Sequence, residues 1–300
     1  MKIAIAGASG MIGSALYDYL SQKGHTMVAI KRNAGDGSLP FIGIDPDYLS
    51  EFDAVINFAG ENIAGKRWTE DQKKAILDSR VKTTTFLAEQ LKKTQSKPKV
   101  FINASAIGYY GNRQSESLDE NSSNGSGFLP EVCRKWEECA DLAARPGLRV
   151  VKTRLGVVLG KNGGALGKML LPFQMGAGGI LGSGKQYMSW VDIHDVVRAF
   201  EYILENESIE GVVNLTAPQP VTNAEFTSAM GKALHRPTVL PAPAIALKIV
   251  LGDMAQEMLL EGQKVLPKKL TESGFKFEYP NVLASLEKEV GSGKTPAHGS

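Results

Sequence analysis

The sequence predicts an α/β fold in which a doubly wound parallel sheet is followed by a smaller α+β region. Short apolar runs at residues 2–6, 26–30, 53–60, 99–105 and 148–154 alternate with stretches of helical periodicity. This alternation is typical of parallel sheets with helices on both faces. A glycine turn joins the first run to the first helical stretch, and after residue 160 the alternation gives way to a glycine-rich segment.

The first run, the glycine turn and the first helical stretch predict a phosphate cradle. Gly7, Gly10 and Gly13 follow the strand at residues 2–6 and open the helix that continues through residues 14–20. The first glycine permits a tight turn, the second lets backbone N–H groups approach a pyrophosphate, and the third lets the helix pack closely. A helix N-terminus also carries partial positive charge. The spacing G-x-x-G-x-x-G differs from the commoner G-x-G-x-x-G, and the alternative is a purely structural turn.

The end of the second strand indicates which cofactor the cradle holds. An NAD site usually places Asp or Glu there to bind the ribose 2′-hydroxyl, whereas this chain has Lys31 and Arg32. A guanidinium pairs with a phosphate in two-pronged fashion, so the basic pair favours NADP(H). The alternative is two solvated charges at a strand end.

Later segments predict further elements of the sheet. Residues 41–44 resemble a third strand, and residues 53–60 form a fourth that ends in Phe58, Ala59 and Gly60, where small residues would let a dinucleotide lie across the strand ends. A long helix is expected over residues 69–93, and by spacing alone its Arg80 is best interpreted as a surface charge. Residues 128–144 predict another helix.

The second half predicts a cap and a few elements that return to the sheet. Residues 160–184 are rich in glycine, which suits a mobile cap over a ligand cleft. Asp192 is a plausible helix cap, residues 211–216 form a strand, and Thr222 with Glu225 forms a capping box. We predict an NADP-binding domain over residues 1–160, with returns near 190–216, a smaller substrate or cap domain over 161–290, and a disordered tail over 291–300.

Composition excludes several classes of protein. The 300 residues carry a formal net charge of +2, which is too small to argue for nucleic-acid binding. No apolar run is long enough to span a membrane, and the chain begins directly in a strand, so we expect a cytoplasmic or organelle-stroma protein. The two cysteines are not spaced to pair on one helix, and the four histidines are scattered, so no metal site is predicted.

Five motifs together resemble the extended short-chain dehydrogenase/reductases, which include sugar-nucleotide epimerases. They are the glycine turn, Asn57-Phe58-Ala59-Gly60, Tyr110-Gly111, residues 154–160 and residues 190–196. More narrowly, the chain resembles the epimerase family of atypical short-chain dehydrogenases. Supporting runs cover nearly the whole chain, and residues 259–267 are the most specific. The resemblance implies a Rossmann domain, a small C-terminal domain and NADP(H).

The resemblance also assigns Arg80 and Arg32 to the cofactor, against the interpretation of Arg80 as a surface charge. The full set of predicted cofactor contacts lies in the glycine turn, at the end of the second strand, at the end of the fourth strand and in the long helix. It comprises Gly7, Ser9, Gly10, Met11, Ile12, Gly13, Lys31, Arg32, Phe58, Ala59, Gly60 and Arg80.

One departure from the wider family concerns catalysis. That family uses a Ser and a Tyr-x-x-x-Lys pair, in which the Tyr phenol is the acid and base. Here the Ser position falls on Ala106, and alignment on Glu137 puts Leu129 at the Tyr position and Cys133 at the Lys position. A hydride transfer still needs a proton donor, and Ser105 and Tyr109 are the candidates at the expected place. Tyr110 and Lys135 lie nearby.

Two functions remain open. The first is an NADP(H)-dependent oxidoreductase or epimerase that acts on a small polar carbonyl or a sugar-like substrate. The second is a regulatory protein that binds NADP(H) without chemistry, for example one linked to cell division, as the labels of relatives suggest. The substrate cannot be identified from the sequence, and a homodimer is an open possibility.

Overall fold

The computed structural model describes residues 1–31, 39–40, 44 and 46–291. A seven-stranded sheet in the order β11-β7-β5-β4-β1-β2-β3 forms its centre, and every paired strand in it runs parallel. The strands are β1 (Lys2–Ala6), β2 (Thr26–Lys31), β3 (Leu39–Pro40), β4 (Ala54–Asn57), β5 (Val100–Ala106), β7 (Arg149–Leu155) and β11 (Gly211–Leu215). The predicted doubly wound sheet is therefore confirmed.

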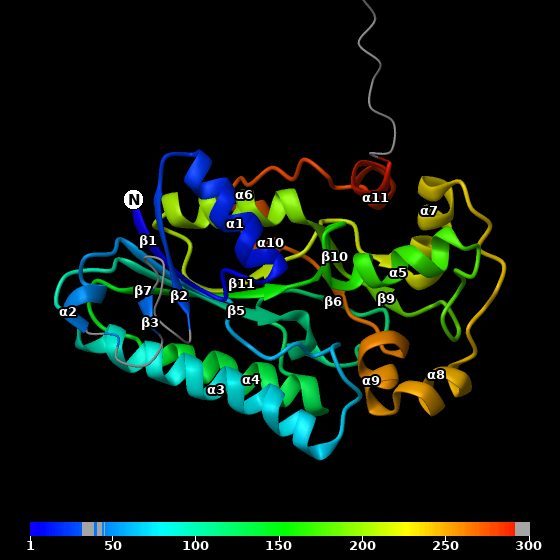
Figure 1. Ribbon diagram of the computed structural model, residues 1–300, viewed down its shortest axis with the longest axis horizontal. Helices are drawn as coiled ribbons and strands as arrows, with labels where there is room; N and C mark the ends of the chain where they lie inside the picture. The colour runs from blue at the N-terminus through cyan, green and yellow to red at the C-terminus, as the bar shows by residue number, and fades with distance from the viewer. Residues whose placement is uncertain (32–38, 41–43, 45, 292–300) are drawn as a thin grey trace, which may run out of the picture.

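Helices cover both faces of the sheet, as Figure 1 shows. On one face, α1 (Met11–Gln22), α6 (Ile193–Glu205) and α10 (Lys268–Glu272) contribute buried apolar residues such as Leu16, Phe200 and Leu270. On the other face lie α2 (Pro46–Leu49), α3 (Glu70–Lys93) and α4 (Phe128–Asp141). The central strands are apolar on both faces because helices bury both of them.

A second group of elements lies beyond the carboxyl edge of the sheet. It contains three two-stranded pairings, β8 (Val157–Leu159) with β10 (Trp190–Asp192), β9 (Tyr187–Met188) with β12 (Val221–Thr222), and β6 (Ser117–Leu118) with β13 (Lys264–Val265). Its helices are α5 (Gly164–Gln174), α7 (Asn223–Leu234), α8 (Ala244–Leu251), α9 (Asp253–Ala255) and α11 (Val282–Val290), with a π-helix η2 at Gln256–Leu260. These helices gather at the right of Figure 1.

Most element predictions agree with the structure, and the caps explain why. Thr69 caps α3 through a hydrogen bond from the Gln72 amide (3.2 Å), and Asp192 caps α6 through the His194 amide (2.8 Å). The capping box that opens α7 is complete, because the Thr222 amide donates to Glu225 (2.7 Å) and the Glu225 amide donates to Thr222 Oγ1 (3.3 Å).

Three segments differ from the expectation or cannot be compared with it. The glycine-rich stretch predicted as a cap contains the helix α5, whose buried Leu166 and Phe173 anchor it to the second group of elements. The strand predicted over residues 41–44 falls mostly outside the described residues, as does the tail predicted over residues 291–300. The domain boundaries stay predictions.

Candidate functional site

The glycine turn lies at the centre of the sheet, where the strand order reverses. From β1 the chain passes to β2 on one side and later to β4 on the other. Such a switch point leaves a crevice at the carboxyl ends of the strands, and ligands of open α/β sheets bind there. Ser9 and Gly10 are exposed at the tip of the turn, whereas Met11 and Ile12 are half-buried as α1 begins.

Two of the three glycines have no room for a side chain. Gly7 has φ +81°, and a Cβ there would lie 2.8 Å from the backbone carbonyl carbon of Phe58. A Cβ on Gly13 would lie 2.2 Å from the Gly7 carbonyl oxygen. The turn is therefore packed against both the start of α1 and the loop after β4, which fixes the direction of the helix N-terminus.

The first turn of α1 is open to an anion. Its N-cap is Gly10, which has no side chain to bind the first amides, and the first turn contains no acidic residue. Helix N-termini of this kind present N–H groups and a partial positive charge to a ligand. The structure thus forms the strand, glycine turn and helix that the sequence predicts, and their role as a phosphate cradle stays a prediction.

The loop after β4 borders this cradle. Asn57 holds its start, since Asn57 Oδ1 accepts from the Ala59 amide (3.0 Å) and Nδ2 donates to Asn103 (2.7 Å) in the core. The Phe58 ring packs against Phe200 with 5.0 Å between ring centroids. A glycine at position 60 leaves room for Arg80, because a Cβ there would lie 3.1 Å from the Arg80 guanidinium carbon.

Arg80 is not a solvated surface charge. Its Nη1 donates to the carbonyls of Glu61 and Ile76, both at 3.0 Å, and its guanidinium lies 4.9 Å from the Trp136 ring centroid. Burial lowers the pKa of Arg80 from its ordinary value. The structure therefore brings Arg80 to the loop of Phe58, Ala59 and Gly60, beside the crevice.

The basic pair after the second strand is described only in part. Lys31 ends β2, at the same edge of the sheet as the glycine turn, and Arg32 lies outside the described residues. The assignment of both residues to a 2′-phosphate stays a prediction.

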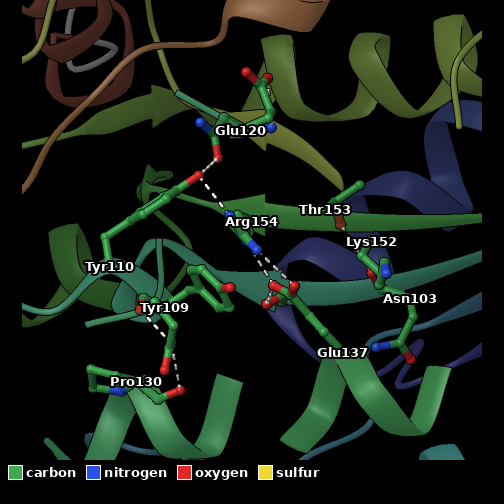
Figure 2. A network of polar contacts seen from close by, with 12 residues as sticks. Asn103, Tyr109, Tyr110, Glu120, Pro130, Glu137, Lys152, Thr153 and Arg154 are labelled. Carbon is green, nitrogen blue, oxygen red and sulfur yellow. Dashed lines mark hydrogen bonds and ion pairs between the residues drawn. The ribbon is translucent and has the colours of Figure 1, made fainter. Parts of the chain in front are cut away.

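A buried polar network lies on the other side of the crevice, at the ends of β5 and β7 (Figure 2). Arg154 on β7 makes a two-pronged ion pair with Glu137 on α4, through Nε–Oε1 and Nη2–Oε2 contacts of 2.8 Å each. Its Nη1 donates to the Tyr110 hydroxyl (2.9 Å), and that hydroxyl lies 2.6 Å from Asn214 Oδ1. Both charged residues are almost completely buried, with 3% of Arg154 and 6% of Glu137 exposed.

The network fixes the charge states of two of its members. Burial disfavours the charge on Arg154, but the hydrogen bonds and charge of Glu137 outweigh it and raise the pKa of Arg154. Burial raises the pKa of Tyr110 to about 12, although Arg154 acts in the opposite direction. Arg154 is therefore a permanent cation, and Tyr110 stays neutral at physiological pH.

The two predicted catalytic residues both contact this network. Ser105 donates to Glu137 Oε1 (2.7 Å), and only 1% of the residue is exposed. The half-buried Tyr109 ring stacks on the Arg154 guanidinium, with 3.4 Å from the guanidinium carbon to the ring centroid. The structure brings both residues together at the end of β5, and their roles in catalysis stay predictions. The geometry suits Tyr109 better as a proton donor, because the hydroxyl of Ser105 is buried and donates its hydrogen bond to Glu137.

The positions of the missing Tyr-x-x-x-Lys pair lie at the start of α4. Cys133 is buried, and this burial raises the pKa of its thiol to about 12, so the thiol is neither acid nor nucleophile. A Cβ on Gly108 would lie 3.2 Å from the Leu129 side chain, so the apolar residue at the Tyr position packs closely on the segment after β5. Lys135 forms an ion pair with Glu131 (3.1 Å).

Glu257 is a contact that no sequence pattern indicates. This residue of η2 accepts from the amides of Phe128 (3.0 Å) and Leu129 (2.8 Å), and it thereby caps α4. The N-cap residue of α4 is Gly127, which cannot supply a side-chain acceptor. The C-terminal segment thus binds the helix on which the wider family carries its catalytic pair.

A cavity of about 600 Å³ adjoins the carboxyl edge of the sheet. Ala64 after β4, Ile107 after β5 and Val157 after β7 line it on the sheet side. The opposite side is lined by α5, α7, β9 and the segment from Leu240 to Gln263. This volume is ordinary for a small-molecule site.

The described residues form neither a metal cluster nor a membrane-spanning helix. Within residues 1–31, 39–40, 44 and 46–291, no three His, Cys, Asp or Glu side chains converge as they would around a metal ion. No helix in the same residues combines the length and the apolar character needed to cross a membrane.

Comparison with known proteins identifies the family. A model described as the NAD dependent epimerase/dehydratase family matches residues 3–216, and a domain of unknown function matches residues 242–289. An epimerase family protein of Mycobacterium tuberculosis is 44% identical over 95% of this chain and 96% of its own length. The human epimerase family protein SDR39U1 is 37% identical over 97% of this chain and its whole length.

Two solved structures agree with this result. The crystal structure of human SDR39U1 with NADPH covers 97% of this chain and all of its own, with a TM-score of 0.90 and 36% identity. A nucleoside-diphosphate sugar epimerase from Corynebacterium glutamicum matches 97% of this chain and 58% of its own, with a TM-score of 0.80 and 32% identity. The family resemblance predicted from the motifs is confirmed: the chain belongs to the NAD dependent epimerase/dehydratase family.

Proposed function

We propose that this protein binds NADP(H) and is an oxidoreductase or epimerase. The observation that carries the proposal is the cradle itself, in which Gly7 and Gly13 pack so closely that side chains are excluded and the first turn of α1 faces the crevice. The human relative was crystallised with NADPH, and the similarity extends over almost the entire chain.

Each predicted cofactor contact has a role in this proposal. The residues of the turn bind the pyrophosphate, the basic pair binds the 2′-phosphate, and the loop after β4 with Arg80 borders the dinucleotide. In chain order these are Gly7, Ser9, Gly10, Met11, Ile12, Gly13, Lys31, Arg32, Phe58, Ala59, Gly60 and Arg80.

The catalytic part of the proposal rests on Tyr109. When bound, NADP(H) donates or accepts a hydride at a carbonyl or alcohol carbon, and a proton moves to or from the substrate oxygen. Tyr109 follows β5 at the crevice and is half-buried, so its hydroxyl is the proposed proton donor. Arg154 holds the Tyr109 ring by stacking, Glu137 holds Arg154, and Ser105 donates a hydrogen bond to Glu137.

Replacement of Gly13 tests the cradle. In Gly13→Ala the new Cβ would collide with the Gly7 carbonyl, so NADPH binding measured by calorimetry should weaken at least about tenfold. Gly167→Ala is the matched control, since a Cβ in that helix would lie 3.7 Å from its nearest neighbour. Equal NADPH affinity in both variants would contradict the proposed cradle.

Replacement of Tyr109 tests the proton donor. Tyr109→Phe keeps the stacked ring and removes the hydroxyl, so turnover should fall by about 10²–10⁴-fold while NADPH affinity is retained. Turnover is followed as NADPH consumption or epimer formation across carbonyl and nucleotide-sugar substrates. Undiminished turnover in this variant would exclude Tyr109 as the donor.

A specific observation supports a second candidate, a regulatory protein that binds NADP(H) without chemistry. Leu129 and the buried Cys133 occupy the places of the Tyr-x-x-x-Lys pair. Under this alternative, no substrate in a broad panel would be turned over, and a protein partner would bind differently with and without NADPH in a pull-down. Turnover of any substrate would favour the enzyme.

A further inference from the structure

The cavity at the carboxyl edge of the sheet is lined mainly by apolar side chains. They come from α5, β9, α7, and the segment that contains α8, α9 and η2. They include Met169, Phe173, Met188, Phe226, Met254 and Met258. Four of these are methionines, whose flexible side chains adapt to ligands of different shape.

The charged groups that line the cavity are engaged by the protein itself. Lys168 Nζ donates to the Ala64 carbonyl, and both oxygens of Glu257 accept from the amides at the start of α4. Glu261 Oε1 accepts from Gln256 Nε2 (2.9 Å). A ligand would have to displace the amides at the start of α4 in order to use both oxygens of Glu257.

Two neutral polar side chains of the lining are engaged in the same way. Gln186 Nε2 donates to the carbonyls of Leu181 (3.0 Å) and Leu259 (2.9 Å). Ser189 Oγ donates to the Gln263 carbonyl (2.8 Å) and accepts from the Val265 amide (2.8 Å). Gln186 and Ser189 therefore support the walls of the cavity through bonds within the protein.

A diphosphate would find few partners in this lining. Phosphate groups are usually bound by arginine forks or by several amides and cations. Among the described residues that line the cavity, Lys168 is the only cation, and no arginine is present. A nucleotide sugar would thus bury two negative charges against a single lysine, and this desolvation is costly.

The surroundings of the cavity favour an apolar ligand as well. Leu240 lines the cavity and is 55% exposed, so it lies at the rim. Leu171 on α5, Met175 directly after it, and Ile245 and Ile249 on α8 are 64–75% exposed, and no residue of α8 is buried. Exposed apolar residues next to an apolar cavity are typical of an entrance for a hydrophobic molecule.

We propose that this cavity is the substrate site and that its ligand is an apolar carbonyl compound or the corresponding alcohol. The ligand carries an alkyl chain or an aromatic ring. It is not a nucleotide sugar or another strongly polar molecule. The proposal rests on the proposed function for the hydride chemistry. In the reducing direction, the carbonyl carbon gains a hydride from NADPH and the oxygen gains a proton, which gives the alcohol and NADP⁺.

The first experiment measures binding to the full chain in the presence of saturating NADPH. N-phenyl-1-naphthylamine, an uncharged fluorescent probe, should bind saturably with a dissociation constant of about 10 μM or lower. The ketones 2-octanone, 2-decanone and 2-dodecanone should displace it, with affinity rising up to about fourfold per methylene. UDP and UDP-glucose at millimolar concentration should not displace it.

A pair of variants on α5 locates the binding. Met169→Trp places a bulky ring at the cavity wall and should weaken probe and ketone binding at least tenfold. Gln174→Trp introduces the same ring on the same helix at an exposed position outside the lining, and binding should change less than twofold. NADPH affinity, measured by calorimetry, should be unchanged in both variants.

Three results would overturn the proposal: no saturable probe binding, tighter binding of UDP-glucose than of 2-dodecanone, or probe binding that Met169→Trp leaves unchanged. The last would place the probe on the exposed apolar surface. The failure of the proposed function is distinguishable, since a protein that binds the ketones in the cavity but no NADPH would refute the cofactor and keep the apolar site.

Discussion

At the scale of single residues, the buried pair of Arg154 and Glu137 determines how the crevice wall is built. The pair positions Ser105, Tyr109 and Tyr110 through hydrogen bonds and stacking. A buried charge is tolerated only when it is paired, because water cannot solvate it there. The pair therefore acts as a support for the segment after β5, where the proposed proton donor lies.

Removal of the charge on Glu137 tests whether the buried pair supports the structure. Glu137→Gln leaves the Arg154 cation buried without its counter-charge, and the free energy of unfolding should fall by about 3 kcal/mol in urea titrations. The control is Glu138→Gln, the next residue of the same helix, whose side chain is 59% exposed and pairs with Arg134. That change should cost less than about 0.5 kcal/mol. Equal effects would mean that the buried pair gives no special support.

At the scale of elements, the contact between η2 and α4 connects the C-terminal segment to a helix that covers the sheet. Helix α4 begins after Gly127, so its first amides depend on an acceptor from elsewhere in the chain, and Glu257 supplies both oxygens. A carboxylate at a helix N-terminus also interacts favourably with the helix dipole. The π-helical turn that carries Glu257 belongs to a class often found at functional sites.

Loss of this cap should be measurable. Glu257→Ala should lower the free energy of unfolding by about 1–2 kcal/mol and speed hydrogen exchange of the Phe128 and Leu129 amides. Glu272→Ala, at an exposed position on α10, is the control and should change neither quantity. Unchanged exchange at the start of α4 in Glu257→Ala would show that the carboxylate does not cap the helix in solution.

At the scale of the whole molecule, cofactor binding should stabilise the fold. A ligand that binds only the folded state adds about 2.7 kcal/mol at 100 times its dissociation constant. For a chain of this size we therefore expect NADPH to raise Tm by roughly 4–5 °C. NADH at the same concentration should raise Tm less, because it lacks the 2′-phosphate that Lys31 and Arg32 are predicted to bind.

The variant Arg32→Ala provides the test of cofactor choice. The Tm shift with NADPH should shrink toward the shift with NADH, while the shift with NADH itself stays the same. Scanning calorimetry of both proteins with each cofactor measures all four shifts. Equal shifts with NADPH and NADH in the unaltered protein would contradict the assignment of NADP(H).

The sequence alone determined the features that depend on neighbours along the chain. The glycine spacing identified the cradle, because backbone conformation and close packing at Gly7 and Gly13 are requirements that only glycine meets. The capping box at Thr222 and the alternation of strands and helices located most elements, since caps and periodicity act within a few residues. The motifs also identified the family.

Only the tertiary structure decided the chemistry around the crevice. Arg154 pairs with Glu137 seventeen residues away, and Glu257 reaches a helix 128 residues earlier, so no local pattern could reveal either contact. Spacing alone indicated that Arg80 was a surface charge. That interpretation was wrong for the same reason, because the loop that buries Arg80 follows another strand. The apolar cavity, likewise, exists only where segments distant in sequence meet, and burial and charge pairing there are properties of the folded chain.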